Sequence, residues 1–170
     1  FKEGKECKVT WMDRITQEAQ IVRNKYTKEA SLITNVEGDW SLYAGHSVEN
    51  INYTAPLLKG NGSGSFHLTV STSIRIYFVF ETQSKRTILS ERHLPMEGGY
   101  NFRDLGGFRT KEGRYTKWGK LFRADELSNL TESDVKYLSS IPITSVIDFR
   151  APAETRRSPD RLPSTVQFTY

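Results

Sequence analysis

Five charged side chains in the second half of this 170-residue chain have types and spacings that suit anion chemistry. They are Arg103, Asp104, Arg123, Asp148 and Arg150. The first two belong to the run Asn-Phe-Arg-Asp-Leu-Gly-Gly at residues 101–107, where the two glycines permit a sharp turn. Arginine can bind a phosphate through two parallel hydrogen bonds. The residues alone favour a second interpretation, in which the Arg and Asp side chains form a network that braces the fold.

The elements around these residues are typical of an α/β layer. Thr131 and Asp134 have the spacing of a capping box and predict a helix start, and Pro142 predicts its end. Residues 143–149 contain four large apolar side chains in seven positions and predict a buried parallel strand, which places Asp148 at its carboxyl end. Ligands gather at that end of strands in open α/β sheets. One helix and one parallel strand cannot enclose a core, so we expect this α/β domain to be cut short.

The first half of the chain predicts strands only. Short apolar runs are separated by turn residues, and residues 74–80, rich in β-branched and aromatic side chains, predict a central strand. Gly60–Gly64 predicts a surface loop. The predicted runs are 7–12, 19–26, 32–36, 40–43, 66–70, 74–80 and 86–89. Their number and spacing favour a β-sandwich of immunoglobulin-like or fibronectin-like kind.

The composition changes near Pro95 and the pair Gly98-Gly99, which marks a domain boundary. We therefore predict a mixed fold, with an all-β sandwich over residues 1–92 and the truncated start of an α/β domain over residues 93–170. The exposed surface of an incomplete α/β layer would be open to self-association or strand exchange.

Composition argues against several classes of function. The 24 basic and 20 acidic residues give a net charge of +4, and the basic residues form no concentrated stripe of the kind that binds nucleic acid. The three histidines lie far apart and match no metal-ligand spacing. No apolar run reaches the length of a membrane span. The compartment stays open, with a secreted or periplasmic location slightly favoured over a cytoplasmic one.

Cys7 is the only cysteine, so it is the only candidate thiol nucleophile and no intrachain disulfide can form. A phosphatase-type cysteine needs an Arg after five intervening residues, so that thiolate and phosphate share one cradle of backbone N–H groups. Asp13 occupies that position here. We interpret Cys7 as a small apolar residue of a strand.

The run from His93 to Gly107 resembles the opening of the bacterial tyrosine (and serine) protein phosphatase family, a group of cysteine-dependent, dual-specificity-like enzymes. The resemblance covers about residues 91–170, and the β-sandwich before it resembles an accessory domain found on some members. Further matching blocks follow in the family's order at residues 119–127, Leu130-Thr131, Val146–Arg150 with Glu154, and Pro159–Pro163.

The resemblance implies a phosphomonoester hydrolase without a cofactor, acting on phosphotyrosine proteins or other phosphomonoesters. In the family, a low-pKa cysteine attacks phosphorus and forms a cysteinyl-phosphate, an Arg holds the phosphate oxygens, and an Asp is the general acid. The family's His-Cys-x-x-Gly-Lys-Asp-Arg-Thr-Gly loop is absent from this sequence. We therefore assign no catalytic residue in this chain and expect no activity from the chain alone.

The residues that the resemblance does carry over are expected to support or border the phosphate loop. They are Asn101, Arg103, Asp104, Arg123, Asp148 and Arg150. The alternative is a non-catalytic β-sandwich module that binds a protein or a glycan, for which Trp40 and Tyr43 would be the aromatic contacts.

Overall fold

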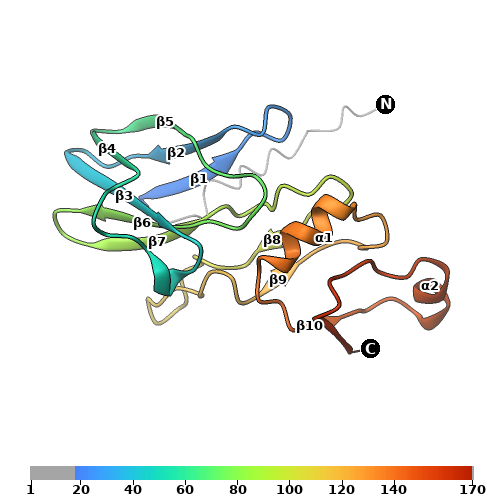
Figure 1. The fold of residues 1–170 in the computed structure, drawn as a ribbon. Coiled ribbons are helices and arrows are strands. Elements are labelled where there is room, and N and C mark those ends of the chain that lie inside the picture. The colour runs from blue at the N-terminus through green and yellow to red at the C-terminus, as the bar shows by residue number, and fades with distance from the viewer. Residues whose placement is uncertain (1–17, 170) are drawn as a thin grey trace, which may run out of the picture.

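A computed structural model describes residues 18–169 of the chain. Residues 19–90 form two antiparallel sheets, and the residues after them contain short strands and two short helices (Figure 1). We call these parts the two-sheet region (residues 18–90) and the carboxy-terminal segment (residues 91–169). The strand predicted at residues 7–12 lies outside the described residues.

The two sheets face each other across one apolar core. The first sheet has the strand order β1-β2-β5 and the second has the order β4-β3-β6-β7. Leu32 of the first sheet packs in the same cluster as Leu42, Phe78 and Phe80 of the second. The bounds are β1 Ala19–Arg23, β2 Ala30–Thr34, β3 Asp39–Gly45, β4 Leu58–Asn61, β5 Gly64–Leu68, β6 Tyr77–Thr82 and β7 Arg86–Ser90, with a 3-10 turn at Val48–Asn50.

Strand β6 is central, as its composition predicts, and both of its faces are covered. It pairs with β3 on one side and with β7 on the other. Phe78 and Phe80 face the core between the sheets, while Tyr77 and Val79 belong to a second cluster that includes Trp118 of the carboxy-terminal segment. Successive residues of a strand point to opposite faces. The unbroken apolar run at residues 77–80 is therefore explained by two partners, one on each face.

The prediction of a surface loop at Gly60–Gly64 was wrong. Gly60 belongs to β4, Gly64 begins β5, and only Gly62 and Ser63 lie between the two strands. A Cβ atom on Gly60 would lie 2.2 Å from the Trp40 ring, so the strand needs a glycine where it passes over that ring. The glycines reflect close packing as well as a turn.

The carboxy-terminal segment has its own apolar cluster around helix α1. Leu130, Leu138 and Ile141 are buried with Phe102 and Met96. The capping box at the helix start is confirmed, since Thr131 Oγ1 accepts from the Asp134 N–H and the Asp134 carboxylate accepts from the Thr131 N–H. The elements are β8 Arg103–Asp104, β9 Phe122–Arg123, α1 Glu132–Ser139, β10 Ser145–Ile147, α2 Pro152–Arg157 and β11 Gln167–Thr169.

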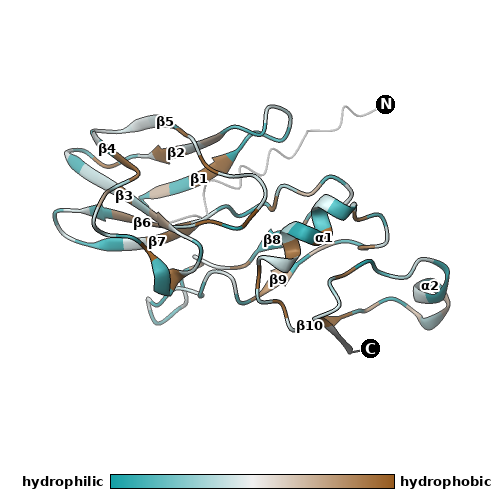
Figure 2. Cartoon of the chain, viewed as in Figure 1, coloured by the Kyte–Doolittle hydropathy of each residue, from teal (hydrophilic) through white to brown (hydrophobic). Residues whose placement is uncertain are grey.

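The strand predicted at residues 143–149 is shorter and less covered than expected. It is parallel to β11, but only Ser145–Ile147 are paired. Ile147 is 64% exposed and Phe149 is 93% exposed, so the prediction of burial was wrong for the chain as it stands. Figure 2 shows the hydrophobic colouring of β10 at one end of the molecule, away from the two sheets. Parallel strands are normally covered on both faces, and here no layer of the described residues covers these side chains.

Helix α2 is absent from the sequence-based predictions, which treat the residues after Glu154 as polar chain. Pro152 occupies its first turn, and the Glu154 carboxylate accepts a hydrogen bond from the Ala151 N–H at 2.8 Å. Proline is favoured at the first helical position because its missing N–H would have no helical partner there. The run Ala-Pro-Ala-Glu was therefore a helix-start signal that the sequence reasoning missed.

The two parts of the chain are in direct contact. Trp118 packs on Tyr77 and Val79, and its indole N–H donates to the Ile88 carbonyl at 3.0 Å. Gly119 follows with a φ of 73° and lies so close to Tyr77 that a Cβ would be 2.2 Å from the phenol oxygen. A glycine is required at this contact, both for its backbone angle and for lack of space.

Gly119→Ala should therefore destabilise the chain more than a change at an open glycine. A left-handed backbone costs about 1–3 kcal/mol for a non-glycine residue, and the overlap with Tyr77 adds to that cost. Gly38→Ala is the matched control, because Gly38 has a φ of 95° but nothing lies within 4 Å of the position that its Cβ would take. Urea unfolding of both variants measures the difference. Equal losses would show that Gly119 and Tyr77 do not restrict each other.

Candidate functional site

The Asn101–Gly107 run folds around strand β8 and presents one polar face to solvent. Asn101 has a left-handed φ of 53°, and its side-chain oxygen accepts from Arg103 Nη2 at 2.6 Å. Its side-chain nitrogen donates to Asp125 at 2.9 Å. Arg103 is directly opposite Arg123 in the β8-β9 pair, so both cations are on the same face of this ladder. The structure thus brings Asn101, Arg103 and Arg123 together with Asp125.

Asp104 points the other way and is fully buried. One carboxylate oxygen accepts from the Gly106 N–H, and the other accepts from the Gly119 N–H, each at 2.8 Å. The second oxygen also pairs with Arg75 Nη2 of the two-sheet region, again at 2.8 Å. The side chains of Arg75 and Asp104 are 1% and 0% exposed. Asp104 therefore supports the run from inside and contacts no solvent-facing group.

The Arg92 side chain binds the backbone of the same turn. Its guanidinium donates to the carbonyls of Asp104 and Gly106, both at 2.9 Å. It also stacks on Phe108 and Trp118, with 4.1 Å and 5.0 Å from its central carbon to the ring centroids. Burial lowers the pKa of Arg92 from its ordinary value, although the neighbouring Asp104 acts in the opposite direction. The turn is thus fixed by one buried carboxylate and one partly buried guanidinium.

Asp148 and Arg150 form a second polar group beside β10. The Arg150 guanidinium binds both oxygens of Asp148, at 2.6–3.0 Å, and donates to Asp160 at 2.8 Å. It also donates to the Ser158 carbonyl at 3.0 Å. Asp160 in turn accepts from the Leu127 N–H at 3.0 Å. This network ties β10 and the chain after α2 to the loop that follows β9.

Hydrogen bonding sets the protonation states of this second group. The hydrogen bond from Arg150 lowers the pKa of Asp148 below its ordinary value, and it outweighs the opposing effect of burial. The same bond, together with Asp160 and Glu126, raises the pKa of Arg150. Both side chains are therefore charged across the neutral pH range. A cation already bound by two carboxylates is less available to an anionic ligand than a free one.

The two polar groups are joined by adjacent residues of one loop. Asp125 bonds Asn101 in the first group, and Glu126 lies 3.8 Å from Arg150 in the second. Asp148 and Arg150, two of the six candidate residues, are thus tied into an Arg–Asp network. Asn101, Arg103 and Arg123 are at least partly exposed and lie near Asp125. Asp104 is buried in the interior. The geometry fits a support role for Asp104, Asp148 and Arg150, while Arg103 and Arg123 are the candidates for contact with an anion.

Sequence reasoning missed several residues that position this site. Arg75 lies within an apolar run, and a single charged residue in such a run could have predicted a buried ion pair. Asp134 was predicted as a helix cap, but it also accepts from the N–H groups of Glu97 and Gly98 at 2.8 Å. Asp160 belongs to the matching block Pro159–Pro163, but nothing in that block predicted its bonds to Leu127 and Arg150, which lie elsewhere in the sequence.

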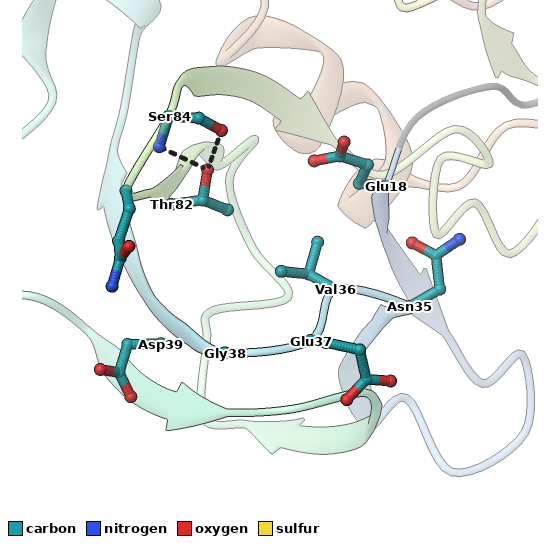
Figure 3. A pocket seen from close by; sticks show the side chains of 9 residues that line it. Glu18, Asn35, Val36, Glu37, Gly38, Asp39, Thr82 and Ser84 are labelled. Carbon is teal, nitrogen blue, oxygen red and sulfur yellow. Dashed lines mark hydrogen bonds between the residues drawn. The ribbon is translucent and has the colours of Figure 1, made fainter.

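A hollow of about 550 Å³ at one end of the two-sheet region is a weaker candidate site (Figure 3). Its carboxylates do not converge, and each has a partner, with Glu18 paired to Lys85, Glu37 bonded to Ser63, and Asp39 bonded to Asn61. Among residues 18–169 no group of three potential metal ligands occurs, and no helix is long and apolar enough to cross a bilayer. The polar groups around β8 and β10 remain the better candidates.

Asp104→Ala should be among the most damaging single changes in the chain. It leaves the Arg75 charge buried without its carboxylate and removes the acceptor of two N–H groups, so we expect a loss of about 3–5 kcal/mol in the free energy of unfolding. Asp125→Ala is the control, since its exposed bond to Asn101 should contribute about 1 kcal/mol or less. Chemical denaturation of both variants measures the two losses in free energy of unfolding. Losses of similar size would contradict the role given to the buried Asp104.

Arg150→Met should weaken the carboxy-terminal segment in a pH-dependent way. At pH 7 we expect a loss of about 1–3 kcal/mol, the range of hydrogen bonds to charged groups. Because the pKa of Asp148 is lowered on folding from 3.8, its contribution is present above that value and is lost as the pH falls through the folded pKa.

Denaturation curves of the chain and of Arg150→Met should therefore converge in acid. Arg156→Met, on the exposed surface of α2, serves as the control and should show no such convergence. A loss that stays constant into strong acid would show that Asp148 is not the partner that matters.

Comparisons with known proteins concern the carboxy-terminal segment. Residues 94–170 match the model of the tyrosine phosphatase family. The chain is 37% identical over 79 residues to the triple specificity protein phosphatase PtpB of Mycobacterium tuberculosis, which covers 46% of this chain and 26% of that protein. It is 35% identical over 70 residues to a Cupriavidus necator protein named provisionally as a tyrosine-protein phosphatase, covering 41% of this chain and 25% of that protein.

The chain thus spans about a quarter of the length of these two curated relatives. The matched region contains both polar groups described above, the one around β8 and the one beside β10. These matches support a bacterial tyrosine phosphatase family for residues 94–170 of the chain.

Proposed function

We propose that residues 94–170 are the amino-terminal part of the catalytic domain of a protein-tyrosine-type phosphatase. The family match over this range carries the proposal. The structure adds that the Asn101–Gly107 run is rigidly held from behind while its polar face, with Asn101 and Arg103, is turned toward solvent. The substrate of the full-length protein is a phosphotyrosine protein or another phosphomonoester.

The proposed reaction passes through a cysteinyl-phosphate. A cysteine thiolate attacks the phosphorus and forms a sulfur–phosphorus bond, while the ester oxygen leaves with a proton from a general acid. Water then attacks the phosphorus of the cysteinyl-phosphate, the sulfur–phosphorus bond breaks, and inorganic phosphate and the cysteine thiolate are released. Cys7 is the only cysteine of this chain and is followed at the sixth position by Asp13, so we assign the nucleophile and the phosphate-binding Arg to sequence outside these 170 residues.

The candidate residues of this chain then border or support the phosphate loop. Arg103 and Arg123, on one face of the β8-β9 ladder, would lower the cost of bringing a dianionic phosphate near. Asp148 and Arg150 would hold the carboxyl end of β10 in place through their mutual ion pair. Asp104 would act only through the backbone of the turn.

We propose that the two-sheet region is a fibronectin-like accessory domain. Among the strands of residues 18–90, the fourth pairs with the third, in the order β4-β3-β6-β7, and three strands form the other sheet. In constant-type immunoglobulin domains the fourth strand joins the first sheet instead. This difference supports the fibronectin-like alternative over the immunoglobulin-like one.

The exposed side of β10 fits an α/β layer that is incomplete in this chain. Ile147 and Phe149 are largely exposed, and β10 has one parallel partner. In a longer chain, further strands or helices would cover them, as parallel sheets require. In the isolated chain the same surface favours self-association.

The isolated chain should therefore show no saturable hydrolysis of a phosphotyrosine peptide or of p-nitrophenyl phosphate, because its one cysteine, Cys7, is not followed by an Arg at the spacing that a phosphate cradle needs. The full-length natural protein should hydrolyse both, and Asp148→Ala or Arg103→Ala in it should lower kcat/KM. Steady-state phosphate release measures all of these rates.

Cys7→Ser is the matched control and should leave the full-length rate unchanged. Saturable turnover by the pure 170-residue chain that disappears in Cys7→Ser would refute the assignment of the nucleophile. A full-length protein without turnover on any aryl phosphate or phosphopeptide would refute the phosphatase proposal itself.

A second candidate function is binding by the two-sheet region. Trp40 is buried in the core and is not available to a partner. Tyr43 and Tyr53, however, lie with ring centroids 5.4 Å apart at the surface, and Arg86 stacks on Tyr53 at 4.9 Å. A tilted aromatic pair beside a cation is a suitable contact for a protein or glycan.

A further inference from the structure

We propose that Arg75 of the two-sheet region is a positioning residue for the Asn101–Gly107 run. Its charge, buried against Asp104, sets the direction in which the exposed face of that run points. The two-sheet region is then an integral clamp on the phosphatase-like segment, and not a separate module on a tether. The effect on catalysis rests on the proposed function, but the positioning itself does not.

The Asp104 carboxylate joins three segments of the chain. Asp104 accepts from the Gly106 N–H in its own turn and from the Gly119 N–H in a later turn, at 2.8 Å in both cases. Arg75 Nη2 joins the same oxygen as Gly119, also at 2.8 Å. Two turns of the carboxy-terminal segment and the strand entry of β6 thus meet at Asp104.

The backbone and the side chain of Arg75 are both held by hydrogen bonds. Its backbone N–H donates to Ser140 Oγ, at the end of α1, at 3.0 Å. Its guanidinium lies 5.6 Å from the Tyr77 ring centroid and interacts with the buried side chains of Tyr77 and Tyr137. Asp104 is the carboxylate that balances its charge, through the bond from Nη2.

The buried surroundings of Arg75 strengthen its interaction with Asp104. Tyr137 of α1 is buried nearby, and burial raises its pKa to about 12, even though the Arg75 charge acts to lower it. Charges in such dry surroundings interact more strongly than at the surface. Removal of one partner should thus disturb the position of the other, since neither side chain is exposed to solvent that could replace it.

Strand β8 links the buried Asp104 to the exposed face of the Asn101–Gly107 run. Arg103 and Asp104 are the two residues of β8 and point to opposite sides. A shift of Asp104 toward solvent would rotate this short strand and turn Arg103 away from Asn101 and Arg123. Arg75 therefore acts on Arg103 through Asp104 and the backbone of β8.

The test is amide hydrogen exchange, followed by NMR on the isotope-labelled 170-residue chain. In Arg75→Met the Gly106 and Gly119 amides should exchange about tenfold faster or more, while the amides of β2 and β3 keep their rates. Arg75→Lys, which retains the charge on a different head group, should fall between the chain and the Met variant. Arg86→Met, at an exposed Arg paired with Glu81, is the control and should leave both glycine amides unchanged.

Faster exchange by the same factor in β2, β3 and both glycines would show a purely global stabilising role and would overturn the proposal. Unchanged glycine amides in Arg75→Met would also overturn it. If Arg75→Met does not fold, Arg75→Lys decides by the same local comparison. Because no phosphatase rate is measured, a failure of the proposed function would leave this result standing, and the reverse also holds.

Discussion

The buried ion pair between Arg75 and Asp104 is the constraint on which the arrangement of this chain depends. Both side chains are buried, so each charge requires the other, and the carboxylate also requires hydrogen-bond donors. The Asp104 carboxylate meets this requirement with the N–H groups of Gly106 and Gly119. The glycines of the run thus serve two purposes, since they allow the turn and bring backbone donors close to a buried anion.

Apolar packing alone would place the two parts of the chain less precisely. Trp118 and Tyr77 form a contact that a neighbouring arrangement could also bury, because dispersion and the hydrophobic effect have little directional preference. A buried ion pair with fixed hydrogen bonds accepts only one register. We infer that the pair contributes specificity of placement more than net stability, as its desolvation offsets much of its attraction.

The sequence predicted local features well and long-range features poorly. The capping box of Thr131 and Asp134 and the central position of β6 follow from short patterns, and both are confirmed. The tight packing of Gly60 on Trp40 and the pairing of Arg150 with Asp160 join residues whose spacing follows no periodic pattern. The site roles of the six candidate residues stay a prediction, and no sequence pattern indicated that Asp104 turns inward, because its partner, Arg75, belongs to the other part of the chain.

Strand β10 is a further case in which the sequence pattern did not predict the long-range environment. Its apolar composition predicts burial, and the composition is informative about the layer in which such a strand is stable. Ile147 and Phe149 are nevertheless exposed, because burial is a property of the surrounding layer and not of the strand itself. The Asp148–Arg150–Asp160 network is already formed without that layer, since its bonds are made by residues 148–160 and the loop after β9. The polar anchoring of this edge therefore does not depend on an apolar covering, because its charged groups bind one another and the neighbouring loop.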